Sequence, residues 1–182
     1  MRLIALFPPG IESEGIKELE ALGGLFIESR NRSVSFEADK ACLYRLYLQA
    51  RLPFRFLREM ARFPCNCSKS LYEGIRHSID WKVWLPPSKS FRVDVSGFNQ
   101  GLTHSHFSAL QVKNALVDFQ RSVWGERSDI DLTNPQICLH VHFTNQEAIL
   151  SLDGSGSSLH RRGYRSAMGV APLKENLAAG LI

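Results

Sequence analysis

The order in which short strand-like and helix-like segments follow one another constrains the fold of this chain most. Apolar residues cluster or alternate over short runs, then recur at the three-to-four-residue spacing of a helix, and Gly or Pro separates the runs. The first expected elements are a strand at 3–7, a helix at 13–22, a hairpin formed by 26–30 and 33–38, and a helix from Asp39 to the residue before Pro53. This order limits the fold to a mixed arrangement of helices and strands.

The stretch from Phe54 to Phe63 fits two structures. As a helix it places its three arginines on one face, whereas as a strand it puts two of them opposite a set of apolar residues. We favour the strand, because it completes the order βαββαβ of a small ferredoxin-like sandwich. Residues 1–63 are therefore predicted to form a ferredoxin-like domain with an α+β, two-layer fold.

A second α/β module is expected over residues 64–165. Its clearest element is a helix at 105–124, which Gly125 ends. The apolar stripe of this helix comprises Val112, Leu116, Phe119 and Val123. The side that faces away comprises Lys113, Gln120 and Arg121. The other expected elements are a short helix at 71–77 and strands at 91–95, 137–143 and 147–153.

Composition points to a folded protein with an anionic partner. Hydrophobic residues make up 44% of the 182 residues, which is enough for a packed core. The formal charge of +4 and a pI near 9.0 are mildly basic, well below the level of a disordered polybasic protein. A folded domain with a cationic face favours nucleic acid as the partner.

The expected location follows from what the sequence lacks. No apolar run is long enough to cross a membrane, and the apolar start is too short for a secretory signal. The four cysteines, Cys42, Cys65, Cys67 and Cys138, do not have the spacing of a disulfide framework. We expect reduced thiols and a cytoplasmic protein.

The densest basic group lies in one short segment. It comprises His160, Arg161, Arg162, Tyr164 and Arg165. Guanidinium groups bond to phosphates through two nitrogens and stack on bases, and a tyrosine ring offers a further stacking plane. The same arginines are equally suited to pair with acids and hold two domains together, and both interpretations stay open. Weaker candidates for RNA contacts are Lys69, Lys89, Lys113 and Arg121.

Other motifs have simpler explanations than chemistry. The Gly- and Ser-rich run at 153–158 follows a strand, but no helix is expected directly after it, so a turn is favoured over a phosphate-binding loop. The pairs His104/His106 and His140/His142 fall short of the ligands that a zinc site needs, and no metal is expected. No nucleophile–base motif is recognisable, and no catalytic residue is assigned.

The final residues begin what is expected to be another helix. Pro172 suits its first turn, and Leu173, Leu177 and Leu181 begin an apolar stripe. The sequence stops at Ile182, in the middle of this helix and on apolar residues. We interpret the end as a truncation.

Two runs of sequence are specific enough to indicate a family. Residues 152–165 read LDGSGSSLHRRGYR, and residues 171–179 read APLKENLAA. Together they resemble the junction between the THUMP and methyltransferase domains in a bacterial family of RNA methyltransferases, which is similar to the large-subunit ribosomal RNA guanine-N2 methyltransferases. LYEG at 71–74, DW at 80–81 and QVKNA at 111–115 resemble the THUMP region of that family. The resemblance extends over essentially the whole chain.

The resemblance implies three parts. These are a ferredoxin-like domain at 1–63, a THUMP domain that binds structured RNA at 64–165, and the first helix of a truncated Rossmann-like methyltransferase domain at 166–182. The family's glycine-rich cofactor loop and its Asn-Pro-Pro-Tyr-like motif are absent from the sequence. No cofactor is therefore expected in this chain, and S-adenosylmethionine is expected in a full-length parent. There, Lys174, Glu175 and Asn176 would lie near the cofactor pocket.

These observations lead to one functional hypothesis and two alternatives. The chain is expected to be non-catalytic and to bind structured RNA, with ribosomal RNA preferred over transfer RNA. Binding would present a guanine to a guanine-N2 methyltransferase domain that the chain lacks. Binding to DNA or to a membrane is not expected. One alternative is a transfer RNA methyltransferase, and the other is a module of two small α/β domains that binds a protein.

Overall fold

The computed structural model describes residues 1–163 and 172–182. Contacts divide the chain into two compact units. The first unit comprises Met1–Arg58 with Gly154–Ile182, and the second comprises Glu59–Asp153. Each unit is described by itself.

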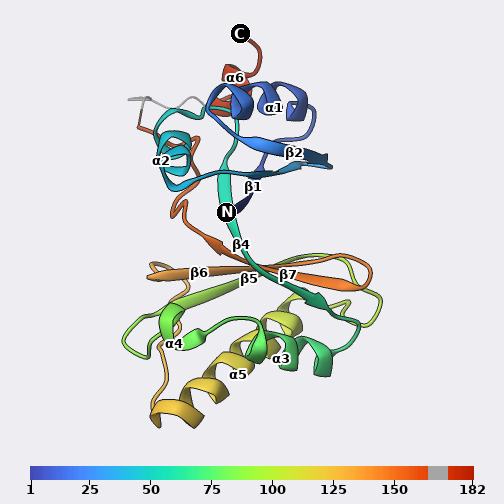
Figure 1. Ribbon diagram of the computed structural model, residues 1–182, viewed down its shortest axis with the longest axis vertical. Helices are drawn as coiled ribbons and strands as arrows, with labels where there is room; N and C mark the ends of the chain where they lie inside the picture. The colour runs from blue at the N-terminus through green and yellow to red at the C-terminus, as the bar shows by residue number, and fades with distance from the viewer. Residues whose placement is uncertain (164–171) are drawn as a thin grey trace. The chain divides into compact units, whose positions relative to one another are not determined.

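The first unit has the predicted βαββαβ order. Its elements are β1 (Arg2–Leu6), α1 (Glu12–Ala21), β2 (Leu25–Arg30), β3 (Ser33–Glu37), α2 (Lys40–Gln49) and β4 (Arg55–Pro64). The strands lie in the order β2-β3-β1-β4, and β1 is antiparallel to both of its neighbours. In Figure 1, α1 and α2 cover the same face of this sheet. The ferredoxin-like prediction is confirmed, and so is the choice of a strand for the stretch that begins at Phe54.

Local sequence explains how these elements begin and end. Side chains of β1 alternate, so that Leu3 and Ala5 are fully buried under the helices. Asp39 caps α2, because its carboxylate accepts a hydrogen bond from the Cys42 backbone N–H at 2.6 Å. The remaining large buried side chains of this core are Phe7, Leu19, Phe36, Leu46 and Phe56.

In the second unit, α3 and α5 lie on one face of a mixed sheet (Figure 1). Besides the second half of β4, its elements are α3 (Ser68–His77), α4 (Trp81–Trp84), β5 (Phe91–Gly97), α5 (Ser105–Trp124), β6 (Ile137–Phe143) and β7 (Glu147–Asp153). The strand order is β4-β7-β6-β5, with β5 and β6 parallel and β6 and β7 antiparallel. The bounds of α5, β6 and β7 coincide with the predicted ones.

The predicted orientation of the last turns of α5 is wrong. Gln120 was expected to face away, but it is fully buried, and its amide donates to the Leu85 carbonyl at 2.8 Å and to the Ser128 hydroxyl at 2.7 Å. Val123 was expected in the apolar stripe but is 39% exposed. The chain after α5 returns over this side of the helix. There the side-chain oxygen of Gln120, Oε1, accepts a hydrogen bond from the Ser128 backbone N–H. The buried Leu85 carbonyl and Ser128 N–H need hydrogen-bond partners, and this need favours burial of the side of α5 that carries Gln120.

Residues after β7 pack on the first unit instead of extending the second. The Phe56 backbone N–H donates to the Ser155 hydroxyl at 2.8 Å, and the Leu159 N–H donates to the Phe54 carbonyl at 2.9 Å. The sequence had assigned 154–165 to the second module, whereas contacts group the described part of this segment with the first unit. The Gly- and Ser-rich run therefore holds a strand edge by hydrogen bonds, which agrees with the expected turn.

The last helix, α6 (Glu175–Ala179), is short, and its buried side differs from the prediction. Leu173 is 48% exposed and Leu181 is 79% exposed, whereas Asn176 is 1% exposed. The Asn176 amide donates to the Leu52 carbonyl at 3.2 Å, so a polar contact anchors this turn in place of the expected leucine stripe. The assignment of 166–182 to a further domain stays a prediction. Over the described residues, no helix combines the length and apolar character needed to span a membrane.

Candidate nucleic-acid interface

Arg162 belongs to the framework of the first unit. Its guanidinium donates to the carbonyls of Tyr47 at 2.9 Å, Leu48 at 3.1 Å and Ala50 at 2.7 Å. The last carbonyls of a helix need donors from outside it, and the fork of Arg162 supplies such donors at the end of α2 and at its C-cap residue, Ala50. The sequence had left RNA contact and a structural role open for this residue. The geometry favours the structural role, with backbone carbonyls in place of the acids that had been expected as partners.

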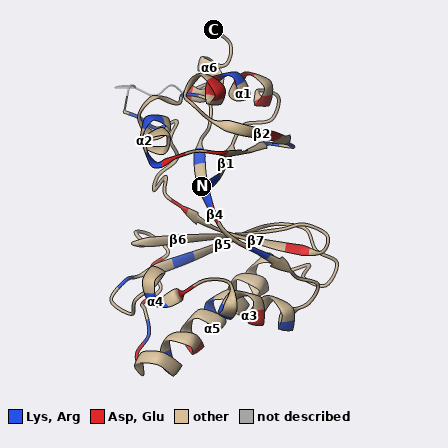
Figure 2. Ribbon diagram, in the orientation of Figure 1, with Lys and Arg blue, Asp and Glu red and all other residues tan. Residues whose placement is uncertain are grey.

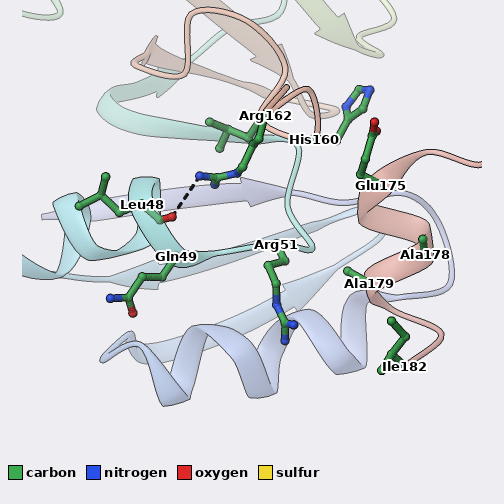
Figure 3. Close-up of a pocket in the computed structure, with 10 residues that line it drawn as sticks. Leu48, Gln49, Arg51, His160, Arg162, Glu175, Ala178, Ala179 and Ile182 are labelled. Atoms are coloured by element: carbon green, nitrogen blue, oxygen red, sulfur yellow. Dashed lines mark hydrogen bonds between the residues drawn. The ribbon is translucent and has the colours of Figure 1, made fainter. Parts of the chain in front are cut away.

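Arg162 lies beside a cavity next to the end of α2, with a volume of about 380 Å³. Figure 3 shows Arg162 with other residues that line this cavity. Leu48 and Gln49 line it from α2, and Ala178 and Ala179 line it from α6. Arg51, His160 and Glu175 also line it, and the Arg162 guanidinium at its edge is already bonded to backbone carbonyls.

A second hollow of the first unit is lined by basic and apolar side chains. Its volume is also about 380 Å³, and its basic lining residues are Arg32, His160 and Lys174. Pro8, Pro9 and Phe54 supply apolar walls. Among the described residues that line it, none is acidic. Positive side chains around an apolar floor suit a phosphate with its attached sugar and base.

The pKa of His160 depends on burial and on the charged side chains around this hollow. Burial lowers the pKa of His160, and the positive charges of Arg161 and Lys174 lower it further, while Glu175 acts in the opposite direction. Its Nδ1 lies 2.7 Å from the Ser158 hydroxyl, which orients the ring. Figure 3 shows Glu175 beside His160. An anion that enters the hollow would raise the pKa of His160 and favour its charged form.

Arg32 was missed by the sequence analysis. It is exposed and lies in the two-residue turn between β2 and β3, where its φ is 58°. The Glu12 carboxylate accepts its backbone N–H at 3.1 Å and that of Gly10 at 2.7 Å, so the turn is fixed beside the first loop. In the sequence, Arg32 is recognisable only as part of the turn between two predicted strands. Its proximity to His160 depends on contacts between distant parts of the chain.

We name Arg32, His160, Arg161 and Lys174 the junction cluster. Arg161 and Lys174 are exposed, and His160 is partly buried. The structure thus places His160 and Arg161, two residues of the predicted basic segment, near Lys174, which was expected at a cofactor pocket, and His160 near Arg32, which was not predicted. Tyr164 and Arg165, which were also predicted, lie outside the described residues. Of the residues expected near a cofactor pocket, Asn176 uses its amide within the unit, because its oxygen accepts the Leu177 backbone N–H at 3.1 Å.

The weaker candidates all lie in the second unit. Lys89 is exposed in the turn before β5, Lys113 is partly buried in the middle of α5, and Arg121 is exposed in its last turn. Figure 2 shows lysine and arginine on the helices and strands of both units. These three residues follow separate elements and do not line a common hollow among those described. Within the described residues, no cluster of three or more His, Cys, Asp or Glu is suited to hold a metal.

Comparison with known proteins assigns both units. Residues 2–57 match the RlmL ferredoxin-like domain, and residues 69–153 match the THUMP domain. A relative from Ectopseudomonas mendocina, named ribosomal RNA large subunit methyltransferase K/L, is 43% identical over 180 residues. The match includes 99% of this chain and 25% of that relative.

Two solved structures resemble the whole chain. A protein from Listeria monocytogenes, named a predicted N6-adenine-specific DNA methylase, is 29% identical with a TM-score of 0.84. SMU.472, provisionally named a methyltransferase and complexed with SAH, is 25% identical with a TM-score of 0.83. In both cases the match covers 99% of this chain and 47% of the other.

The chain is therefore a pair of domains, one ferredoxin-like and one THUMP, of the kind found together in nucleic-acid methyltransferases. Its two domains, a ferredoxin-like domain of the RlmL type and a THUMP domain, correspond to the N-terminal portion of longer relatives that are named RNA methyltransferases. It spans about a quarter of the length of the ribosomal RNA relative and under half of each solved relative.

Proposed function

We propose that this chain binds structured RNA and presents it to an S-adenosylmethionine-dependent methyltransferase domain of the whole protein. The observation that carries the proposal is the THUMP match at 69–153 in a chain whose 43% identical relative is named a ribosomal RNA methyltransferase. SAH in the SMU.472 complex is the product that S-adenosylmethionine leaves after methyl transfer, which supports that donor for the whole protein.

Ribosomal RNA is the proposed substrate, and the exocyclic N2 of a guanine is the proposed acceptor. The name of the Ectopseudomonas relative supports the RNA class. The name of the Listeria protein specifies adenine in DNA, which makes DNA the comparison that a binding experiment needs.

Within this chain, the junction cluster is the proposed phosphate-binding site of the first unit. Arg32 and Lys174 are exposed and line the hollow together with His160, and the exposed Arg161 directly follows His160 in the chain. Contacts to phosphates would fix the orientation of the RNA, while the modified base is selected by the domain that carries out the reaction. Such positioning lowers the entropic cost of bringing the acceptor amine to the methyl donor.

Filter binding of the 182-residue chain to a folded ribosomal RNA fragment tests the proposal. If the junction cluster neutralises about three phosphates, the logarithm of the association constant falls with the logarithm of salt with a slope of roughly −2 to −3. Arg161→Ala should weaken binding and reduce this slope by about 1. Binding that is independent of salt would contradict the proposal and favour a protein-binding module.

Competition distinguishes the nucleic acids. Folded ribosomal RNA should displace the labelled fragment at lower concentrations than bulk transfer RNA or duplex DNA of the same length. More effective competition by transfer RNA would favour the transfer RNA alternative, and more effective competition by DNA would overturn the RNA assignment.

A further inference from the structure

One end of the second unit is held rigid by a buried asparagine. Asn99 is 1% exposed, and its amide nitrogen donates to the Cys65 carbonyl at 2.6 Å, while its oxygen accepts the Gly101 backbone N–H at 3.0 Å. A Cβ at Gly101 would overlap the Asn66 carbonyl, so the loop after β5 packs directly against the start of α3. Side chains on this loop are therefore presented by a fixed backbone.

Two phenylalanines are exposed on this loop and on the helix that follows. Phe98 is 60% exposed, and Phe107, in the first turn of α5, is 47% exposed. In the same unit Phe91 and Phe143 are buried, at 0% and 3%. Neither Phe98 nor Phe107 belongs to the hydrophobic core of the unit among the residues described. Exposed aromatic rings on a rigid segment are suited to contact a partner, because ordering them costs little entropy.

The charge around these rings favours an anionic partner. Residues 96–108 contain neither Asp nor Glu but include two exposed histidines, His104 and His106. Lys69, which is exposed, lies in the first turn of α3, and that helix starts beside the same loop. The N-cap residue of α5, His104, makes no side-chain cap, so the positive end of the helix dipole adds to this charge. Figure 1 shows α3 and α5 starting at the same end of the unit.

Nucleic acid is the partner that combines planar apolar groups with negative charge. Bases stack on aromatic rings with little regard to sequence, and the backbone phosphates need nearby cations. Bases within a duplex are already stacked, so only unpaired nucleotides can use such rings. An acidic protein would satisfy the charge but would leave the two rings without a matching planar surface.

We propose that the segment from Phe98 to Phe107, with Lys69, is a platform for unpaired RNA nucleotides. Phe98 and Phe107 stack on bases, while Lys69 and the histidines contact the adjacent phosphates. The inference rests on the proposed RNA-binding function and assigns to the second unit the single-stranded part of the bound RNA.

The test compares two RNAs and matched variants of the full chain. One RNA is a stem-loop with 2-aminopurine in its loop, and the other is a blunt duplex with the sequence of the stem. The variants are Phe98→Ala, Phe107→Ala and Phe98→Trp, with Phe26→Ala as control, because Phe26 is 79% exposed but lies in the first unit. Circular dichroism checks that each variant is folded.

The unmodified chain should prefer the stem-loop and change the 2-aminopurine fluorescence on binding. Each alanine variant should weaken stem-loop binding by about tenfold, in line with the contribution of one stacked base, and leave duplex binding unchanged. Phe98→Trp should retain the affinity and the fluorescence change, and Phe26→Ala should bind like the unmodified chain.

Three results would overturn the inference. If both RNAs bind equally and the alanine variants bind as the unmodified chain does, the platform is wrong while the proposed RNA-binding function stands. If Phe26→Ala weakens binding as much as Phe98→Ala, the effect is not specific to the platform. If the unmodified chain binds neither RNA even in low salt, the proposed function fails and the inference fails with it.

Discussion

Arg161 and Arg162 are neighbours in sequence, and the structure predicts opposite consequences when each is replaced. Arg162→Ala removes the guanidinium from three carbonyls at the end of α2. Two of these hydrogen bonds, to Tyr47 and Ala50, are partly buried, and the one to Leu48 is exposed, where water can replace it. With about 1 kcal/mol for each partly buried hydrogen bond, the substitution should lower the free energy of unfolding by about 2 kcal/mol.

Thermal unfolding followed by circular dichroism measures this effect. For a chain of this size that unfolds cooperatively, a loss of about 2 kcal/mol lowers the midpoint by roughly 4–8 °C. Arg161→Ala is the matched control, because Arg161 is exposed and its substitution should change the free energy of unfolding by less than about 0.5 kcal/mol. Arg162→Lys keeps the charge but loses the planar fork, and it should fall between the unmodified chain and Arg162→Ala.

RNA binding at a temperature where all variants are folded completes the comparison. Arg162→Ala should bind RNA as the unmodified chain does, whereas Arg161→Ala should bind more weakly and with a smaller salt dependence. The reasoning is refuted if Arg162→Ala keeps the original midpoint but loses RNA affinity, because Arg162 would then be a phosphate ligand and not part of the framework.

Three further predictions concern stability. Gly97→Ala should lower the free energy of unfolding by more than about 3 kcal/mol, because Gly97 has a φ of 83° and a Cβ there would overlap the Phe143 carbonyl; a urea midpoint within error of the unmodified chain would contradict this. Gln120→Ala should lower it by about 3 kcal/mol in the same assay, since the buried Leu85 carbonyl and the buried Ser128 backbone N–H lose their hydrogen bonds to the Gln120 amide, whereas Arg121→Ala, at an exposed position, should have little effect. Burial holds the pKa of His160 below its ordinary value of 6.5, so the unfolded chain binds more protons between the folded pKa and 6.5, and stability should rise with pH in that window. Urea midpoints across this range should change less with pH in His160→Asn, and an unchanged pH dependence would count against the lowered pKa.

Element order could be predicted from the sequence because the signals that define it are local. Apolar spacing within α5 and Gly125 after it set the bounds of that helix, and strict alternation set those of β6. The break at Thr144-Asn145-Gln146 marked the start of β7. The boundary between the units could not be predicted in the same way. It falls inside β4, after Arg58, and a strand that continues without interruption carries no local sign of a boundary.

Roles of individual polar residues needed the tertiary structure, because their partners lie far away in sequence. Arg162 contacts carbonyls 112 to 115 residues earlier, so its sequence context, a run of basic residues, could not distinguish a helix cap from a phosphate ligand. Gln120 has the helical position of a surface residue, and only the return of the chain at Ser128 makes burial of its amide favourable. Arg32 and His160 line the same hollow, and their proximity likewise depends on packing between distant parts of the chain.

The sequence by itself determined the class of fold, the order of the elements and the resemblance to known proteins, because residue spacing and specific runs of residues are properties of short segments. The tertiary structure alone decided which basic residues remain available to an anion and which complete the backbone hydrogen bonds of the fold. The physical reason is that a buried carbonyl or N–H must find a partner wherever packing provides one, and that partner is selected by distance in space.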